Sequence, residues 1–578
     1  MGRRIGYLII FLFFASPAFG ATKYVSPSGS AAWANCNSTG TPCSVATAMS
    51  NAAAGDIVLF MDGTYDAPTS PTYRDLVWNP AHSGTSGNPI TFKALNRHQA
   101  IIKGTGSEDG SGAYAQPVIG AIGRNYITWD GFYLYARNSS DTANIFVTAR
   151  IDGSTGCSVI NNTFQAGSHS SGGATNNAGV FFQGANYLTI ENNTFFGFRE
   201  ASNNENNAAI LGYPSSYVTI KNNTIYDCTG GINLKDRISY ATVENNFISN
   251  CFRAIYAPNA NGGSSTDLTI HNNVLANNTR SAIVTGNDGV INNQIISNNT
   301  IYLSSSPTYD YGDIELKNTG ISTSGYPKIY NNIVYRGWGS LVTNGTANML
   351  AECDHNQYST NLRIVVHKYV AGETTYTSLS AWQSSGELYG GGNPGAGSLN
   401  SDPLFVNSSG DMDELADFAL QSGSPCLGAG RGGVDMGADI TLVGVDAGEE
   451  DTTPPVRSNG SPSGTIEYTA TVTLSLNTNE TATCKWDTSS GTAYASMDNT
   501  FTNTNSTSHS HASVAVSEGA NIFYVRCEDG SDNENTDDYS ISFTVEEGTP
   551  PPSPVTNFNI LSTGASTIGG GIGSLTIQ

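Results

Sequence analysis

A short alternation of apolar and polar positions, followed by two asparagines, recurs between Ser158 and Val334. It first reads VINNTF at Val159–Phe164 and returns at Leu188–Phe195 and Val218–Ile225. Alternating β-branched and threonine positions predict a short strand on each side of the pair. Asparagine tolerates a left-handed backbone, so each pair predicts a tight corner between two strands. The seven pairs are Asn161-Asn162, Asn192-Asn193, Asn222-Asn223, Asn245-Asn246, Asn272-Asn273, Asn298-Asn299 and Asn331-Asn332.

The spacing of these pairs predicts a solenoid. The first asparagines follow one another after 31, 30, 23, 27, 26 and 33 residues, which fits a constant corner with variable insertions rather than a helical repeat of fixed length. Each unit is then one coil of a parallel β-helix, right-handed like other parallel crossovers. We expect equivalent asparagine side chains to stack, each amide donating to the next, at about 0.5–1.5 kcal/mol per bond.

The segments that precede the repeat predict a signal peptide and an N-terminal cap. Residues 1–20 predict a signal peptide, because Arg3 and Arg4 precede an apolar run and small residues precede the expected cleavage site. The run is too short to cross a bilayer comfortably. We therefore expect a secreted or cell-surface protein without membrane insertion. Ser44–Ala54 is a candidate helix that caps the open first coil, and Tyr126–Phe132 takes the place of an early repeat phrase.

The repeat ends near residue 445, and the composition then changes. Residues 446–456 form an acidic, proline-containing linker, residues 457–547 alternate like the strands of a small β-sandwich, and residues 548–578 form a Pro-, Gly- and Ser-rich tail. The predicted fold is therefore all-β: a right-handed parallel β-helix over residues 21–445 with an N-terminal helical cap, followed by the sandwich.

The net charge of the chain limits the classes of partner that we expect. The 578 residues carry a net charge of −23, and only 13% of them are charged. This balance argues against nucleic acid and anionic membranes as partners, and a polyanionic substrate would need a local basic patch. We expect a monomer.

Nine cysteines in an exported chain raise the question of disulfides. Cys228 and Cys251 occupy the same slot in successive coils, where either a bridge or a stack of buried thiols fits. The candidate pairs are Cys36–Cys43, Cys228–Cys251, Cys353–Cys426 and Cys484–Cys527.

Several segments resemble the right-handed parallel β-helix proteins of the pectate-lyase superfamily. They are AAAGDIVLFMDGTY, SGTSGNPITFKA, NYITWDGF and the repeated TIxNNTI phrase, and Ser401–Ala438 is similar to the closing segment of many secreted members. The resemblance covers residues 22–445 and implies the fold. It leaves the activity open, because the superfamily includes lyases, hydrolases, epimerases, adhesins and non-catalytic proteins. The module after residue 456 resembles immunoglobulin-like or fibronectin type III-like domains.

A second strand in each coil predicts a binding stripe. If its second residue points inward, the third and fifth face outward. Aromatic rings alternating with lysine and asparagine along such a stripe suit a sugar chain, although an ordinary solvated face would look similar. The substrate-binding candidates are Phe181, Gln183, Tyr213, Asn233, Tyr256, Glu315 and Lys317.

The catalytic candidates are Lys235, Arg237 and Arg253, because β-elimination from a uronate needs a base and a cation for the carboxylate. Alginate and chondroitinase B-like lyases of the superfamily use a lysine and an arginine beside calcium, so the resemblance leaves Ca²⁺ open as a cofactor. This chain departs from them. Tyr256–Pro258 stands where they have Arg-His-Gly, and glycines precede Lys235 where they have acidic ligands. A solvated lysine is the alternative for Lys235.

We therefore predict a secreted β-helix protein that recognises an extracellular polysaccharide, with polysaccharide lyase activity around Lys235 as an open question. The alternative is a non-catalytic surface or adhesion protein whose β-helix is a rigid rod.

Overall fold

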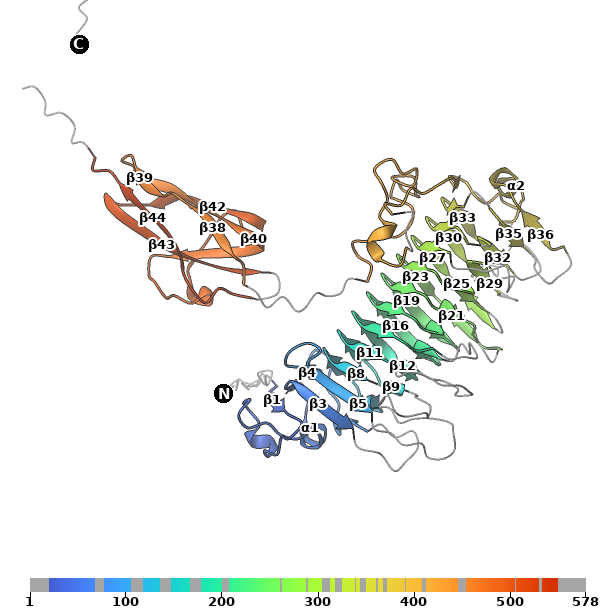
Figure 1. Ribbon diagram of the computed structural model, residues 1–578, viewed down its shortest axis with the longest axis horizontal. Coiled ribbons are helices and arrows are strands. Elements are labelled where there is room, and N and C mark those ends of the chain that lie inside the picture. The colour runs from blue at the N-terminus through green and yellow to red at the C-terminus, as the bar shows by residue number, and fades with distance from the viewer. Residues whose placement is uncertain are drawn as a thin grey trace, which may run out of the picture. The chain divides into compact units, whose positions relative to one another are not determined.

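The computed structural model describes residues 20–548 with gaps at 68–76, 105–117, 136–146, 167–177, 200–206, 260–261, 287–288, 304–311, 318–324, 338, 344–349, 360–361, 367–371, 390, 408–411, 445–453, 505 and 530–532. The predicted signal peptide up to residue 19 and the tail from residue 549 lie outside these residues. The chain divides into two compact units, one ending at Glu449 and the other starting at Glu450 (Figure 1). No helix among the described residues is long and apolar enough to cross a membrane.

The first unit coils through three long sheets, here called A, B and C, in that order within each turn (Figure 1). Neighbouring strands are parallel throughout, apart from the last pair in sheet C. Sheet A contains β1 (Thr22–Val25), β2 (Ile57–Phe60), β4 (Ile90–Ala94), β7 (Ile127–Asp130), β10 (Ser158–Ile160), β13 (Asn186–Glu191), β16 (Ser215–Lys221), β19 (Ile238–Glu244), β23 (Leu268–His271), β27 (Ile295–Ser297), β30 (Lys328–Tyr330) and β33 (Glu352–Asp354).

Sheet B follows sheet A across the asparagine corner. It contains β3 (Gly63–Ala67), β5 (Ala100–Gly104), β8 (Tyr133–Tyr135), β11 (Thr163–Gln165), β14 (Thr194–Phe196), β17 (Thr224–Tyr226), β20 (Phe247–Ser249), β24 (Val274–Ala276), β28 (Thr300–Tyr302), β31 (Ile333–Tyr335), β34 (Gln357–Tyr358) and β37 (Leu399–Asn400).

Sheet C completes each coil. It contains β6 (Ile119–Ile122), β9 (Val147–Asp152), β12 (Ala178–Gln183), β15 (Ala208–Gly212), β18 (Gly230–Leu234), β21 (Arg253–Ala257), β25 (Ser281–Thr285), β29 (Ile314–Leu316), β32 (Leu341–Thr343), β35 (Ile364–Val366) and β36 (Thr374–Tyr376). A small extra pair, β22 (Ser264–Thr266) and β26 (Val290–Asn292), lies outside the three sheets.

The two asparagines of each pair have different roles. The first takes the left-handed backbone of the corner, with φ of 55° at both Asn192 and Asn222. The second is buried and forms the predicted ladder: the backbone N and the Nδ2 of Asn193 both donate to Oδ1 of Asn223 at 3.0 Å. The ladder runs through Asn162, Asn193, Asn223, Asn246, Asn273, Asn299, Asn332 and Asn356.

The ladder is one rung longer than the sequence pattern indicated. Asn356 follows His355 rather than another asparagine, and its backbone N donates to Oγ of Ser398 at 3.0 Å. His355 has a φ of 47°, so a histidine takes the left-handed corner at this rung.

The predicted N-terminal cap is present. Helix α1 (Val45–Asn51) begins at Ser44, whose Oγ accepts a hydrogen bond from the backbone N of Thr47 at 3.2 Å. The helix buries Ala48 and Met49 in the same core as the first strands. It therefore covers apolar side chains of the first coil that would otherwise be exposed to solvent.

Residues 412–444, here called the C-terminal strap, cover the outer face of sheet B. The strap contains the 3₁₀ turn Leu415–Phe418, and a shorter helix, α2 (Leu379–Gln383), precedes it. The strap is held by the corner asparagines, since Oδ1 of Asn272 accepts from the backbone N of Asp439 at 2.7 Å. Its apolar cluster with sheet B contains Val274, Tyr302, Ile333, Met412, Phe418, Met436 and Val443.

The second unit is a smaller β structure with its own core. Strand β40 (Thr471–Asp487) changes partners along its length: its first half pairs with β38 and β42, and its second half pairs with β41 and β43. The other strands are β38 (Arg457–Ser461), β39 (Gly464–Ile466), β41 (Asn499–Thr500), β42 (Ser506–Ala515), β43 (Gly519–Asp529) and β44 (Tyr539–Val545), with a 3₁₀ turn at Tyr494–Ser496.

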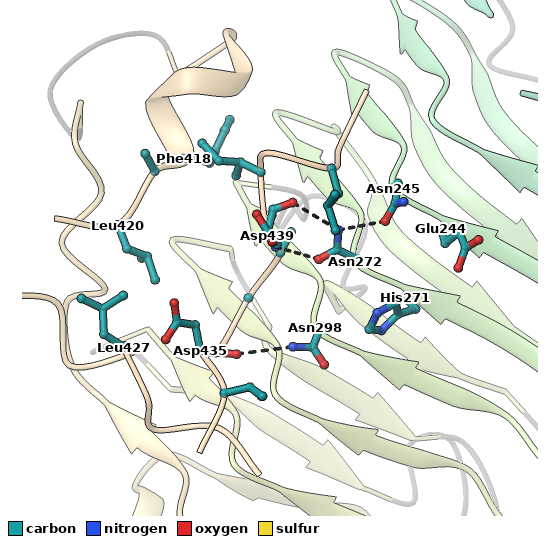
Figure 2. Close-up of a pocket in the computed structure, with 16 residues that line it drawn as sticks. Glu244, Asn245, His271, Asn272, Asn298, Phe418, Leu420, Leu427, Asp435 and Asp439 are labelled. Atoms are coloured by element: carbon teal, nitrogen blue, oxygen red, sulfur yellow. Dashed lines mark hydrogen bonds between the residues drawn. The ribbon is translucent and has the colours of Figure 1, made fainter. Parts of the chain in front are cut away.

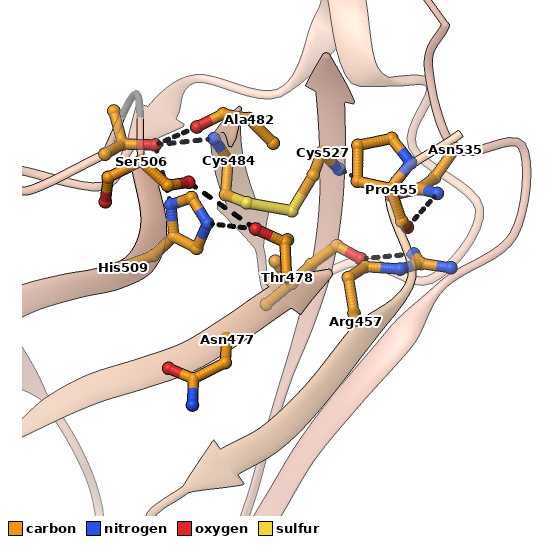
Figure 3. The surroundings of a disulfide bond; sticks show 12 residues. Pro455, Arg457, Asn477, Thr478, Ala482, Cys484, Ser506, His509, Cys527 and Asn535 are labelled. Atoms are coloured by element: carbon orange, nitrogen blue, oxygen red, sulfur yellow. Dashed lines mark hydrogen bonds between the residues drawn. A yellow bond between two sulfur atoms is a disulfide. The ribbon is translucent and has the colours of Figure 1, made fainter. Parts of the chain in front are cut away.

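A disulfide joins Cys484 to Cys527 in this unit (Figure 3). The two residues are register partners on the adjacent antiparallel strands β40 and β43. Immunoglobulin domains instead join two facing sheets with their disulfide. The immunoglobulin-like or fibronectin type III-like assignment therefore stays a prediction.

The remaining candidate cysteines are free thiols. Sγ of Cys36 donates to the carbonyl of Trp33 at 3.2 Å and Sγ of Cys43 to the carbonyl of Tyr24 at 3.5 Å. Burial, with a smaller contribution from Cys36, raises the pKa of Cys43 to about 12. Cys228 and Cys251 are likewise buried thiols in adjacent coils, one of the two arrangements expected for them, and each donates to a backbone carbonyl two residues before it.

The predicted Cys353–Cys426 pair is wrong in this structure, where both residues are free. Cys353 points into the β-helix core beside Tyr358, while Cys426 lies in the separate cluster between sheet B and the strap. Sheet B separates the two clusters, and this separation could not be read from the spacing of the cysteines.

Candidate functional site

The outer face of sheet C carries the predicted stripe in register. Val180, Ile210, Ile232 and their equivalents point into the core, so the following residue on each strand faces outward. Consecutive pairings align these outward residues across the coils. The row reads Phe181, Leu211, Asn233, Tyr256, Val284 and Glu315.

A second outer row lies where the strands of sheet C end. The backbone N of Lys235 donates to the carbonyl of Gly212 at 2.8 Å, which places Lys235 beside Tyr213. Lys317 extends β29 in the same way through the carbonyl of Thr285 at 2.8 Å. The candidates Gln183, Tyr213, Lys235 and Lys317 therefore share this edge of the sheet.

Three cations lie over aromatic rings on this face. The guanidinium carbon of Arg150 is 5.3 Å from the ring centre of Phe181. Nζ of Lys235 is 5.2 Å from the ring centre of Tyr213 and donates to its hydroxyl at 3.0 Å. These contacts fix the directions of long side chains that would otherwise be mobile.

The third of these contacts lies one coil beyond Lys235. The guanidinium carbon of Arg253 is 4.2 Å from the ring centre of Tyr256. Arg253 is only 3% exposed, so its charge is held largely out of water beside the ring. Phe181 and Tyr213 also contact each other, with ring centres 5.5 Å apart.

Four residues of this outward row are buried: Leu211, Asn233, Val284 and Glu315. For the candidates Asn233 and Glu315 this differs from the expectation of an exposed stripe. Asn233 is 1% exposed and lies between Leu211 and Tyr256 on the adjoining rungs. Glu315 is fully buried, and its Oε1 lies 3.4 Å from Nζ of Lys317. The direction in which a side chain points follows from the alternation along its own strand. Its exposure to solvent depends in addition on how the neighbouring coils cover it.

The three catalytic candidates do not form one cluster. Arg253 pairs in register with Gly230, at the start of β18, whereas Lys235 follows the end of that strand. Five residues of extended chain separate these positions, or roughly 16 Å. Arg237 lies in the next corner with a φ of 42°, and its Nη2 pairs with Asp236 at 3.1 Å. Lys235 and Arg253 share a face; Arg237 turns away from it.

Arg150 is a member of this face that the sequence reasoning missed. It aligns with Phe181 on β12 and pairs with Asp152 at 2.5 Å. Its coil precedes the first asparagine pair, so the repeat phrase did not mark it. The alternation in Val147–Asp152 was the available signal.

Calcium has no evident site among the residues that the structure describes, where no group of three His, Cys, Asp or Glu side chains can hold a metal ion.

The architecture matches a known family model. The model described as "Right handed beta helix region" matches residues 148–334, which contain the asparagine ladder from Asn162 to Asn332. The first unit is a right-handed parallel β-helix. No curated protein sequence matches the chain.

Several solved structures are similar to this chain at low sequence identity. Pectate lyase Pel9A is 15% identical with a TM-score of 0.45, over 73% of this chain and 96% of that one. The GH136 lacto-N-biosidase from Eubacterium ramulus is 11% identical with a TM-score of 0.37, over 66% and 67%. An alginate lyase from Paenibacillus sp. str. FPU-7 is 14% identical with a TM-score of 0.32, over 61% and 99%. This level of similarity concerns the fold alone.

Proposed function

We propose that the outer face of sheet C binds an anionic extracellular polysaccharide laid along the axis of the β-helix. The observation that carries this proposal is the set of cation–aromatic contacts at Phe181, Tyr213 and Tyr256. The partly exposed rings offer surfaces for sugar rings, and the partly exposed cations Arg150 and Lys235 offer partners for carboxylates. A periodic face of this kind suits a polymer better than a single small molecule.

The cations on this face contrast with the negative net charge of the whole chain. A chain with a net charge of −23 repels polyanions at long range. Binding must therefore depend on the local cations, which include Arg150, Lys235, Arg253 and Lys317. Such binding weakens as salt screens the partly exposed pairs.

Cleavage by β-elimination is the finer part of the proposal. Lys235 is the candidate to take the proton, because its Nζ is already hydrogen-bonded to the hydroxyl of Tyr213 at 3.0 Å. Arg253 is nearly buried over the ring of Tyr256, so its role in the proposal is to add positive charge behind the face one coil beyond Lys235.

A panel of polymers tests both parts. The mature protein is run in native gels that contain polygalacturonate, alginate, chondroitin sulfate or a neutral glucan, and the same polymers are followed for the ultraviolet absorbance of an unsaturated uronate. Retardation by a uronate polymer but not by the glucan supports binding. Product formation that is lost in Lys235→Ala supports the lyase. No retardation by any polyanion contradicts the proposal and favours the rigid rod.

A further inference from the structure

A cavity of about 630 Å³ lies between the corner after sheet A and the C-terminal strap (Figure 2). Its floor contains Glu244 and His271, which are register partners at the ends of β19 and β23. The corner residues Asn245, Asn272 and Asn298 also line it. No residue of the sheet C stripe takes part, so this is a separate site of a size typical for small ligands.

The wall opposite the floor is aliphatic. Leu427, Val434 and Leu442 of the strap line the cavity and are 39%, 48% and 51% exposed. Leu420 adds to the same wall. A ligand with one polar edge and one apolar face would cover these side chains and satisfy the floor.

The charges of the cavity select against anions. Neither lysine nor arginine is among its described lining residues, while Glu244, Asp435 and Asp439 are. The two aspartates already have partners in the strap: Oδ1 of Asp435 accepts from the backbone N of Gly428 at 2.7 Å, and Oδ1 of Asp439 accepts from Thr441 Oγ1 at 2.6 Å.

Glu244 is the carboxylate left for a ligand. Its register neighbour Lys221 directs Nζ to Glu191 on the far side, at 2.9 Å. No ion pair joins Glu244 to a residue that the structure describes. On the other side, Nδ1 of His271 lies 3.1 Å from Oγ of Ser297. Burial lowers the pKa of His271, and this effect outweighs the opposite effect of the neighbouring charge of Glu244.

We propose that this cavity binds a pyranoside that carries a free amine, such as a hexosamine residue. The ammonium group pairs with the carboxylate of Glu244, and the C–H face of the ring packs on Leu427, Val434 and Leu442. The His271 ring bonds a hydroxyl. Charge complementarity favours this ligand over a uronate, which would place a second carboxylate beside Glu244.

Calorimetric titration of the full mature chain with glucosamine tetrasaccharide and N-acetylglucosamine tetrasaccharide tests the proposal. We expect the amine form to bind about tenfold more tightly, the effect of one charge-assisted contact. Glu244→Gln should remove that preference, whereas Asp227→Asn, a carboxylate outside the cavity that pairs with Arg199, should keep it. Equal affinity for both sugars, or no binding of either, would overturn the proposal.

Two further measurements make the result specific. Leu442→Ser should weaken the amine sugar severalfold with an unchanged unfolding curve, since Leu442 is half exposed and its loss leaves no core cavity. A lysine-rich peptide that binds as tightly as the amine sugar, and is equally sensitive to Glu244→Gln, would assign the cavity to peptides and contradict the saccharide.

Discussion

Nζ of Lys235 donates to the hydroxyl of Tyr213 on the preceding coil at 3.0 Å, and it also lies over that ring. The lysine is thereby held on the outer edge of sheet C rather than free in solvent. The same relationship between a cation and a ring occurs at Arg253 and Tyr256 one coil further along. These two pairs place positive charge beside aromatic rings on the outer face of sheet C.

The Tyr213→Phe substitution tests the contribution of the hydrogen bond to Lys235 separately from that of the aromatic ring. The ring that stacks on a sugar remains, while Lys235 loses its acceptor. We expect polymer binding to weaken by about threefold or less and any lyase turnover to fall much further. Affinity gels and the ultraviolet assay, run side by side, measure the two effects. An equal loss in both would show that the hydroxyl serves binding only.

The asparagine ladder should dominate local stability. Asn223 is fully buried and joins rungs on both sides, so Asn223→Ala leaves the amide of Asn193 without its acceptor. We expect a loss of about 2–4 kcal/mol in the free energy of unfolding of the first unit. Urea denaturation measures it.

The matched control is the other member of the same pair. Asn222 has a φ of 55°, which glycine adopts freely, so Asn222→Gly should cost well under 1 kcal/mol. Similar losses for the two variants would contradict the division of roles within the pair.

The disulfide Cys484–Cys527 closes a loop of 43 residues in the second unit. Its removal in the double variant Cys484→Ala, Cys527→Ala should destabilise that unit by about 4 kcal/mol through the entropy of the unfolded chain. Calorimetry of the full chain should show one transition shifted down and the β-helix transition unchanged. A shift of both transitions would contradict the independence of the two cores.

His509 gives the second unit a pH dependence. It is buried and bonds to Thr478 Oγ1 at 2.9 Å (Figure 3). It also bonds to Thr504 Oγ1 at 3.0 Å, and burial lowers its pKa. The unfolded chain therefore binds a proton more readily than the folded one. Stability should fall as pH drops through about 6.5, the ordinary histidine value. Denaturation of His509→Gln over the same range should show a flatter profile, and an unchanged slope would assign the effect to another group.

The sequence predicted the coils, the ladder and the outward row because each depends on local alternation. Asn193 and Asn223 could be placed from their phrase alone, as could the direction of Phe181 and Glu315. The burial of Glu315 could not, because it depends on how neighbouring coils cover it. The cavity could not be predicted from the sequence either, because it forms where Asn272 meets Asp439, and 167 residues separate these two positions in the chain.

The most direct test of the central claim is the affinity of the mature protein for a galacturonate oligosaccharide, measured by calorimetry at low and high salt. We predict measurable binding that weakens with salt and falls about three- to tenfold in Lys235→Ala. Lys221→Ala, a partly exposed lysine of sheet A, should bind like the wild type. Binding that is insensitive to Lys235, or lost equally in Lys221→Ala, would contradict the assignment of the site to sheet C.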